Sequence, residues 1–394
     1  MLNLSKTVKN LVRHRHHWDK VMQATAARRP LPQFNNSPDS HLREVTGFGS
    51  NPGALRMFMY VPERLAPSPA LVVALHGCTQ NATSYDHGSG WSTLASRHGF
   101  VVLLPEQQPA NNPKNCFSWF QPSDTARGHG EALSISQMVE RAIADYGIDR
   151  RRVYVTGLSA GGAMASAMLA TYPDVFAGGA IIAGLPYGAA ANVQEAFASM
   201  RGRSRSAAEW AELVRAASPY QGPWPKISVW HGTADATVDP LNADEIVKQW
   251  TTLHGLPVVP TRDDRVNGYP RQVWCSPTGD ELVESYTLTG MAHGTPLAIG
   301  PAADQGGSAG AFFLDVGISS SFHIAKFWGL VGDTYIPAVE DITLAPVPHE
   351  LLRGAEERVG EPIHTEPTEH DEDKPPFNVQ AVITNALKAA GLMK

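Results

Sequence analysis

The stretch RVYVTGLSAGGAMASAML, residues 152–169, contains the pattern that decides the fold. Residues 152–156 are mostly apolar and β-branched, as in a buried strand, and residues 162–169 are small, as in a closely packed helix. Between them lies Gly157-Leu158-Ser159-Ala160-Gly161. Its glycines predict a tight reversal of the chain that holds Ser159 in a strained conformation. A serine at such a strand-to-helix turn is typical of a nucleophile beside N–H groups that bind a developing oxyanion.

Strands and helices alternate on both sides of this turn. We expect two N-terminal strands, 42–48 and 54–61, joined by a turn at 50–53. Further strands are expected at 70–75, 100–104, 152–156, 176–183, 227–230 and 281–288, and helices at 91–98, 130–146, 162–169, 206–217 and 240–253. This alternation predicts a doubly wound, mostly parallel sheet with helices on both faces. Together with the turn at Ser159 it predicts an α/β-hydrolase fold.

Composition limits the function. The chain has 394 residues, 18% of them charged, and a net charge of −6, which argues against nucleic acid as a partner. No apolar run is long enough to span a bilayer. The first 20 residues lack the apolar core of a secretory signal, and three cysteines are too few for a disulfide framework. We therefore expect a cytoplasmic protein.

Three segments are predicted. Residues 1–41 form an extension with a short basic amphipathic helix, and residues 42–335 form the catalytic domain. Residues 336–394 contain an acidic, proline-containing linker and a C-terminal amphipathic helix at 377–392. We expect both terminal helices to pack on the domain. Their contact with a polymer granule or membrane surface is the alternative.

A nucleophilic serine needs a base, and the base needs an orienting acid, in the chain order Ser, acid, His. Two aspartates follow the strand at 227–230. Asp239 precedes Pro240 and a helical pattern, which is typical of a helix N-cap, so we assign the acid to Asp235. The base is assigned to His293, which lies between glycines just after the strand at 281–288.

The oxyanion hole is expected at two backbone N–H groups. One is that of Ala160, directly after the nucleophile, and the other is that of Cys78, in the turn after the strand at 70–75. His76 and His231 are interpreted as ordinary hydrogen-bonded histidines. No metal ion or organic cofactor is implied, because the serine chemistry is complete without one.

Several motifs resemble the esterase family of poly(3-hydroxybutyrate) depolymerases over residues 45 to 330. They are LHGCTQ at 75–80, PEQ at 105–107, CFSWF at 116–120, GEA at 130–132, VTGLSAGGAM at 155–164, GLPYG at 184–188 and GMAHG at 290–294. The resemblance implies hydrolysis of a short-chain-length polyhydroxyalkanoate or its oligomers. It assigns nucleophile, acid and base to Ser159, Asp235 and His293, and an oxyanion donor to Cys78.

The resemblance also suggests a disulfide between Cys78 and Cys116, whereas a cytoplasmic location argues against one, so the pairing stays open. Secreted members of the family carry a signal peptide and a polymer-binding domain. Neither is visible here, which favours the cytoplasm. An extracellular location, as for most of the family, is the alternative. Trp119, Phe120 and Tyr187 lie in loops and are candidates for an apolar substrate groove.

Two rival functions remain. The first is a feruloyl or acetylxylan esterase, since related families share the architecture and the three catalytic residues. The second is a non-enzymatic granule-associated protein, against which the complete set of catalytic residues argues.

Overall fold

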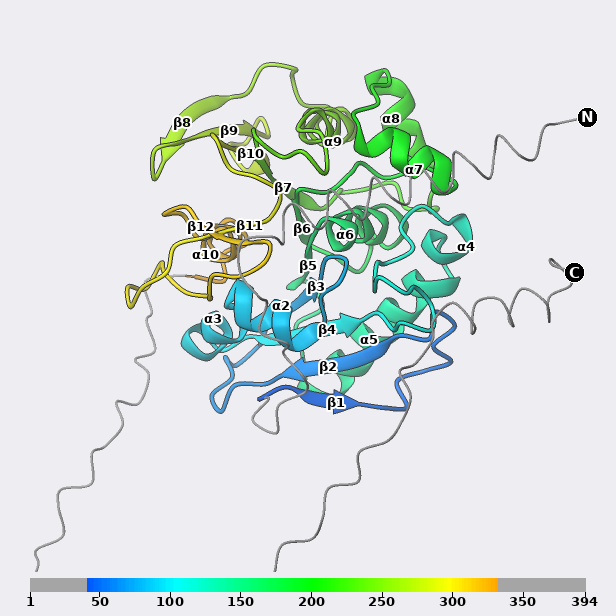
Figure 1. Ribbon diagram of the computed structural model, residues 1–394, viewed down its shortest axis with the longest axis vertical. Coiled ribbons are helices and arrows are strands. Elements are labelled where there is room, and N and C mark those ends of the chain that lie inside the picture. The colour runs from blue at the N-terminus through cyan, green and yellow to red at the C-terminus, as the bar shows by residue number, and fades with distance from the viewer. Residues whose placement is uncertain (1–40, 332–394) are drawn as a thin grey trace, which may run out of the picture. The chain divides into compact units, whose positions relative to one another are not determined.

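The computed structural model describes residues 41–331 (Figure 1). The predictions for residues 1–40 and 332–394, which include both amphipathic helices and the acidic linker, lie outside the described residues. Within the described range, one large sheet runs through the fold with helices on both of its faces. The predicted α/β-hydrolase architecture is therefore present.

Ten strands form this sheet, in the order β1-β2-β4-β3-β5-β6-β7-β10-β9-β8, and β11 and β12 form a separate pair. The six central strands, from β4 to β10, are parallel, and an antiparallel hairpin flanks them at each edge. The strands are β1 (Arg43–Val45), β2 (Arg56–Tyr60), β3 (Leu71–Leu75), β4 (Val101–Glu106), β5 (Val153–Leu158), β6 (Gly178–Ile182), β7 (Lys226–Gly232), β8 (Arg262–Val266), β9 (Tyr269–Cys275), β10 (Glu281–Leu288), β11 (Thr295–Leu297) and β12 (Phe313–Asp315).

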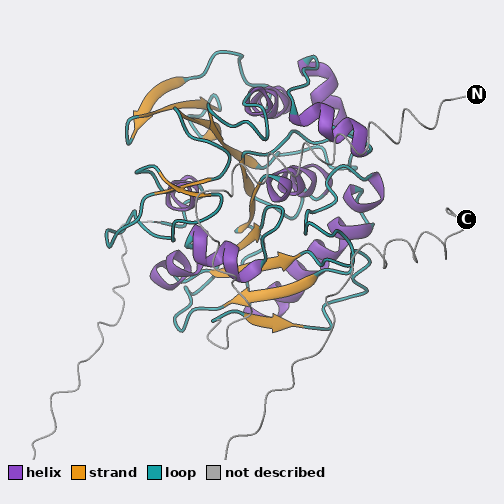
Figure 2. Cartoon of the chain, viewed as in Figure 1, coloured by secondary structure: helices purple, strands orange, loops and turns teal. Residues whose placement is uncertain are grey.

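The helices form a layer on each side of the sheet (Figure 2). Helices α5, α6 and α9 pack on one face, and α2, α3 and α10 pack on the other. The helices of the described residues are α2 (Ala82–Ser89), α3 (Trp91–His98), α4 (Pro122–Thr125), α5 (Gly130–Tyr146), α6 (Ala160–Thr171), α7 (Val193–Met200), α8 (Ala207–Arg215), α9 (Leu241–Leu253) and α10 (Ser320–Phe327).

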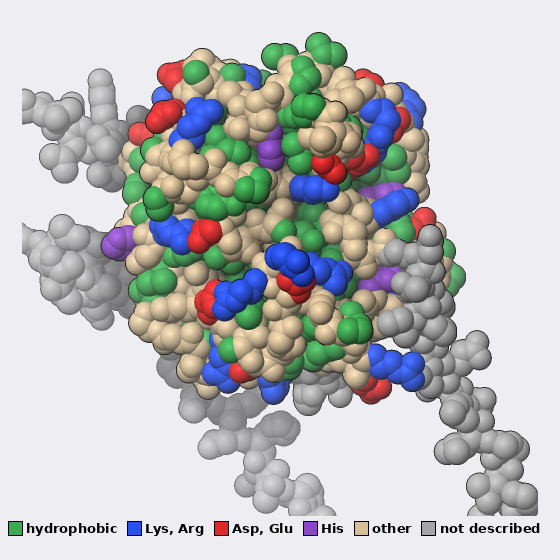
Figure 3. All heavy atoms as spheres, turned by 180° about the vertical axis from the view of Figure 1, so that it is seen from behind, with side chains coloured by type: hydrophobic (Ala, Val, Ile, Leu, Met, Phe, Trp, Pro, Cys, Tyr) green, Lys and Arg blue, Asp and Glu red, His purple; other side chains and the backbone are tan. Residues whose placement is uncertain are grey.

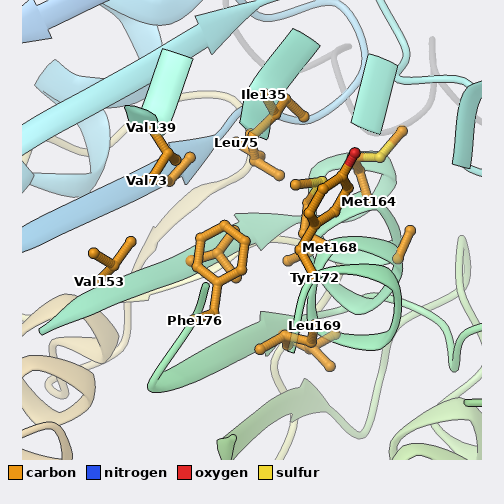
Figure 4. Packing of buried hydrophobic residues seen from close by; sticks show 14 of the residues in the cluster. Val73, Leu75, Ile135, Val139, Val153, Met164, Met168, Leu169, Tyr172 and Phe176 are labelled. Atoms are coloured by element: carbon orange, nitrogen blue, oxygen red, sulfur yellow. The ribbon is translucent and has the colours of Figure 1, made fainter. Parts of the chain in front are cut away.

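Strand β3 explains why this sheet carries a core on each face. Its side chains alternate, so Val73 and Leu75 pack under α5 and α6, while Val72 packs under α2 and α3. All five of its residues are buried, which is why the strand is a continuous apolar run. Figure 4 shows Met164 and Met168 of α6 in the first of these cores, beside the side chains from β3 and α5.

Most charged side chains of residues 41–331 are at least partly exposed, although a few, such as Glu131 and Glu284, are buried. On the face shown in Figure 3, Lys and Arg side chains lie mostly beside Asp and Glu, and no large field of one sign forms. Exposed ion pairs contribute only about 0–1 kcal/mol each, so the stability of the fold comes mainly from the apolar layers. None of the helices within residues 41–331 combines the length and the apolar character needed to cross a membrane.

The structure adds elements that the sequence interpretation missed. The hairpin β8–β9 turns at Asn267 and Gly268, which both have positive φ, 51° and 85°. Asn-Gly between alternating residues is the strongest short hairpin signal, and it was available in the sequence. Helix α9 begins at Leu241, with Pro240 as its N-cap residue, while Asp239 accepts the Leu241 N–H at 2.9 Å. The helix therefore begins one residue later than predicted, and Asp239 is not its N-cap residue, although its side chain still accepts an N–H of the first turn.

Candidate active site

Ser159 lies between β5 and α6 in a backbone conformation that residues other than glycine rarely adopt, with φ 57° and ψ −116°. Its N–H donates to the Ile182 carbonyl at 2.9 Å, which ties the turn to β6. Such a conformation costs about 1–3 kcal/mol and persists only where the surroundings impose it. The strain predicted for this serine is therefore present.

The two glycines of the pentapeptide are required for a different reason from the one the sequence suggested. Neither has a positive φ; instead, neither has room for a side chain. A Cβ on Gly157 would lie 2.4 Å from the Gly161 carbonyl carbon, and a Cβ on Gly161 would lie 2.2 Å from the Leu75 carbonyl oxygen. The glycines thus allow α6 to approach the ends of β3 and β5, while Ser159 itself takes the strained turn.

A pocket opens above this turn and contains about 260 Å³ of space, open solvent included. Its walls come from four separate parts of the chain: the loop after β3, the turn at Ser159, the loop after β7 and the segments around β11 and β12. The lining residues are Gly77, Cys78, Gln80, Leu158, Ser159, Thr237, His293 and Phe312. The predicted nucleophile Ser159, the base His293 and the oxyanion donor Cys78 therefore line one pocket.

Asp235 and His293 are joined by a buried hydrogen bond. His293 Nδ1 lies 2.7 Å from Asp235 Oδ2, and both side chains are at most 4% exposed. A carboxylate only accepts, so the proton is on Nδ1, and Nε2 is left to receive a proton from a hydroxyl. The other oxygen, Oδ1, accepts the N–H groups of Thr237 and Val238 at 2.8 and 2.9 Å. Asp235 is thereby fixed in orientation by the loop that carries it.

His231 is a fourth group that contacts this carboxylate. Its Nε2 lies 2.9 Å from the Val238 carbonyl oxygen and 3.2 Å from Asp235 Oδ2. Both are acceptors, so Nε2 carries a proton that points between them. Burial alone would raise the pKa of Asp235, but the hydrogen bonds from His231 and His293 outweigh it and hold the pKa well below its usual range. Asp235 therefore stays ionised beside His293.

The Cys78 loop is held from both sides. Cys78 forms a disulfide with Cys116, so the pairing that the sequence left open is present. His76 Nε2 accepts the Gln107 N–H at 3.1 Å, so its Nδ1 carries the proton and donates to the Gly77 carbonyl at 2.8 Å. In a trans peptide the C=O and the following N–H point in opposite directions. Anchoring the Gly77 carbonyl on His76 therefore directs the Cys78 N–H away from His76.

Neither oxyanion candidate has its donor occupied. No hydrogen bond joins the N–H of Cys78 or of Ala160 to an acceptor within residues 41–331. Ala160 is the first residue of α6, where N–H groups have no partner in the helix and the helix dipole favours negative charge. Both groups are thus free to bind an oxygen atom in the pocket.

A buried polar network supports the Cys78 loop from behind. Gln107 Nε2 donates to Glu131 at 2.6 Å, and Glu131 also accepts the Ser118 N–H at 2.8 Å. Burial raises the pKa of Glu131 to about 7, although these hydrogen bonds partly offset the effect. The buried carboxyl group of Glu131, at the start of α5, therefore helps to position the segment that carries Cys116.

The predicted groove residues lie elsewhere than the pocket wall. Trp119 and Phe120 contact one another edge-to-face at 5.5 Å, and Tyr187 packs against the core that includes α9. None of the three is among the residues that line the pocket. Phe312 is, and nothing in the sequence analysis indicated it. Within residues 41–331, no group of three or more His, Cys, Asp or Glu side chains could hold a metal ion.

Comparison with known proteins relates this site to a family. The sequence model described as esterase PHB depolymerase matches residues 55–271, more than half of the chain. The chain belongs to this family. The matched range includes Ser159 and Asp235 and ends before His293.

Individual relatives of this esterase differ in their names. The chain is 52% identical to poly(3-hydroxyalkanoate) depolymerase C of Paucimonas lemoignei, over 74% of this chain and 70% of the relative. It is 34% identical to feruloyl esterase B of Talaromyces stipitatus, over 68% of this chain and 76% of the relative. Acetylxylan esterase A of Emericella nidulans is 39% identical, over 64% of this chain and 84% of the relative.

A solved structure extends the comparison to three dimensions. The acetyl xylan esterase from Aspergillus awamori has a TM-score of 0.62 and 28% identity, covering 74% of this chain and 99% of that chain. Family and relatives agree on the reaction class. The chain is a carboxylic ester hydrolase with an α/β-hydrolase fold.

Proposed function

We propose that this esterase hydrolyses ester bonds of a short-chain-length polyhydroxyalkanoate or its oligomers through an acyl-enzyme on Ser159. The observation that carries the proposal is the pocket that Ser159 and His293 share, with Asp235 bonded to His293 at 2.7 Å. The substrate class is supported by the 52% identity to a poly(3-hydroxyalkanoate) depolymerase, well above the identities to the two carbohydrate esterases.

The reaction has two half-reactions. His293 Nε2 takes the proton of Ser159 as Oγ attacks the ester carbonyl carbon, and the N–H groups of Cys78 and Ala160 bind the oxyanion. The bond to the leaving alcohol then breaks, and its oxygen receives the proton from His293. Water repeats the sequence on the acyl-enzyme, with His293 again as base, and releases a hydroxy acid. Asp235 holds the imidazole in the required tautomer throughout.

The test is release of 3-hydroxybutyrate from amorphous poly(3-hydroxybutyrate) particles by the wild-type chain and by Ser159→Ala. We expect release by the wild type and loss of about 10⁴-fold or more of the rate in the variant. Acetylated and feruloylated xylan serve as parallel substrates. Cleavage of xylan esters alone would overturn the polyester assignment and leave the serine mechanism in place.

A carbohydrate esterase is the second candidate, favoured by the structural match that covers 99% of an acetyl xylan esterase. The non-enzymatic alternative gains no support, since the named relatives are all ester hydrolases or depolymerases. Contact of the terminal segments with polymer granules stays a prediction. Deleting residues 1–40 should reduce adsorption to granules without changing hydrolysis of a soluble ester if that prediction is right.

For the place of action, we propose an oxidising compartment, which is the extracellular alternative. The support is the Cys78–Cys116 disulfide, because such bonds persist outside the reducing cytosol. Labelling of the denatured protein with a thiol reagent, directly after isolation from its native host, is the test. One reactive thiol, that of Cys275, is expected. Three reactive thiols would instead favour the cytoplasm.

A further inference from the structure

Among the residues that line the pocket and have no role in the mechanism above, Phe312 alone has a positive φ. Its φ is +64°, a conformation that costs a bulky side chain strain. Its ring is half-buried, lines the pocket, and meets the His293 ring nearly at right angles, with centroids 6.0 Å apart. A strained residue in a reactive pocket calls for a functional explanation.

The surrounding backbone imposes this position. The Phe312 carbonyl accepts the Thr295 N–H at 2.8 Å, at the start of the parallel pair β11–β12 (Figure 1). Gly294, directly after His293, has no room for a side chain, since a Cβ there would lie 2.8 Å from the Phe312 carbonyl oxygen. The segment that carries the base and the segment that carries Phe312 are thus in direct backbone contact, which places the Phe312 ring beside His293.

The chemistry tells which part of the substrate this ring faces. During acylation His293 Nε2 gives its proton to the oxygen of the leaving alcohol, so that oxygen lies within hydrogen-bond distance of the imidazole. Carbon atoms attached to it then lie beside whatever flanks His293 on the pocket side. That flank is the Phe312 ring. The acyl chain, in contrast, is attached to the carbonyl carbon between Ser159 and the oxyanion donors.

We infer that Phe312 is the specificity-determining residue for the alcohol part of the ester, and that its ring packs against branched alkyl alcohols. In a polyester of 3-hydroxy acids the leaving group is a secondary alcohol, and its carbinol carbon bears an alkyl group. Such a group suits an apolar aromatic wall. This inference rests on the proposed reaction at Ser159 but not on the polymer as its substrate. It assigns Phe312 to acylation alone, because the alcohol has left before water attacks.

The test separates the two half-reactions in Phe312→Ala. One series of butyrate esters varies the alcohol, methyl against sec-butyl, and a second series of methyl esters varies the acyl chain. We expect kcat/KM for sec-butyl butyrate to fall about tenfold relative to methyl butyrate, the usual size of a lost apolar contact, with acyl preference unchanged. Deacylation, followed as the decay of butyryl-Ser159 by mass spectrometry after rapid quenching, should keep its wild-type rate.

The outcomes are distinct. If the ring only supports His293, deacylation slows together with acylation, because His293 is the base in both, and the inference is overturned. Equal losses for both alcohols, or no loss, also overturn it. Phe312→Tyr keeps the ring and should keep the preference, which covers the case in which the alanine variant does not fold. Phe313→Leu, at the next residue but with its side chain buried against Tyr85, is the matched control and should leave the alcohol preference unchanged.

The inference and the polymer assignment fail in different ways. The alcohol series uses small soluble butyrate esters, so it can be read whether or not poly(3-hydroxybutyrate) is cleaved, provided that the wild type hydrolyses methyl butyrate. Failure of the polymer assignment appears as xylan cleavage by the wild type. Failure of the inference appears only in the comparison of wild type with the Phe312 variants.

Discussion

On one side of the pocket, Ser159, Ala160 and Cys78 are positioned by the backbone. On the other side, Asp235 and His293 are side chains that hydrogen bonds hold in place. The first side depends on close approach of main chain to main chain, as at Gly161. The second depends on hydrogen bonds that converge on one carboxylate. We therefore expect the oxyanion side to tolerate almost no change in the backbone, and the acid–base side to lose activity gradually as hydrogen bonds are removed.

A pair of glycine variants tests this contrast most strongly. Gly161→Ala places a Cβ 2.2 Å from the Leu75 carbonyl oxygen, and two main-chain segments must separate. We expect a loss of more than about 4 kcal/mol in the free energy of unfolding, or no soluble protein. Gly290→Ala, in the loop before His293, meets nothing within 4 Å and only has an unfavourable φ of +75°. It should cost about 1–2 kcal/mol.

Chemical denaturation of both variants measures the difference. Similar losses in the two proteins would show that the oxyanion side is no more constrained than the base loop.

Removing the disulfide is expected to have the next largest effect. The bond closes a loop with a sequence separation of 38 residues, so its loss frees chain entropy in the unfolded state worth about 3–4 kcal/mol. The double variant Cys78→Ser/Cys116→Ser should therefore melt about 10 °C lower. It keeps the Cys78 N–H and the bond from the Thr79 N–H to the Lys114 carbonyl, so part of the activity should remain. Cys275→Ser is the control and should melt like the wild type.

The same contrast explains what could be predicted from sequence. The serine turn was found because its determinants are local: an apolar strand, two glycines and small helical residues. Asp235 and His293 were found because each follows a strand of a predictable sheet, and the structure brings them together; their roles in turnover stay predictions. The core strands were predictable because β3 and β5 are buried on both faces.

Other features could not be found in this way. His231 lies in β7 and contacts Asp235 only because the loop after this strand folds back over it, and no local pattern distinguishes it from a core histidine. Phe312 reaches the pocket through the pairing of β11 with β12, two strands of three residues without a periodic signal. The Cys78–Cys116 bond was suggested by family resemblance alone. Contacts between loops far apart in the chain are thus what the sequence left out.

His76 gives a smaller and kinetic test of the oxyanion side. His76→Phe removes the donor that anchors the Gly77 carbonyl, so the Cys78 N–H loses its fixed direction. We expect kcat for a soluble ester to fall up to about 10²-fold with KM nearly unchanged, since the N–H acts on the transition state. A KM increase with unchanged kcat would contradict this assignment.

The pH dependence of stability provides a second readout for His76. Burial lowers the pKa of His76 to about 4, so the folded state binds a proton less readily than the unfolded state. Its stabilising contribution is present above the unfolded pKa of about 6.5 and is lost as pH falls toward 4. Thermal melting of the wild type should therefore decline more steeply over this range than that of His76→Phe.

The smallest effect is expected at His231, on the acid–base side. His231→Phe fills the same space but removes one of the four N–H donors to Asp235, so we expect about a tenfold loss of kcat/KM. His231→Gln keeps an N–H donor and should recover most of the lost kcat/KM.

The pH dependence of stability provides a second readout for His231. The lowered pKa of Asp235 stabilises the folded state above the unfolded pKa, and this contribution is lost as pH falls through the folded value. Without the His231 donor the pKa of Asp235 rises toward its usual range, so this contribution is smaller, and the melting temperature of His231→Phe should fall less than that of the wild type as pH drops below the unfolded pKa of Asp235. If the Phe and Gln variants behave alike in both assays, His231 only fills space, and Asp235 is oriented by its own loop and His293 alone.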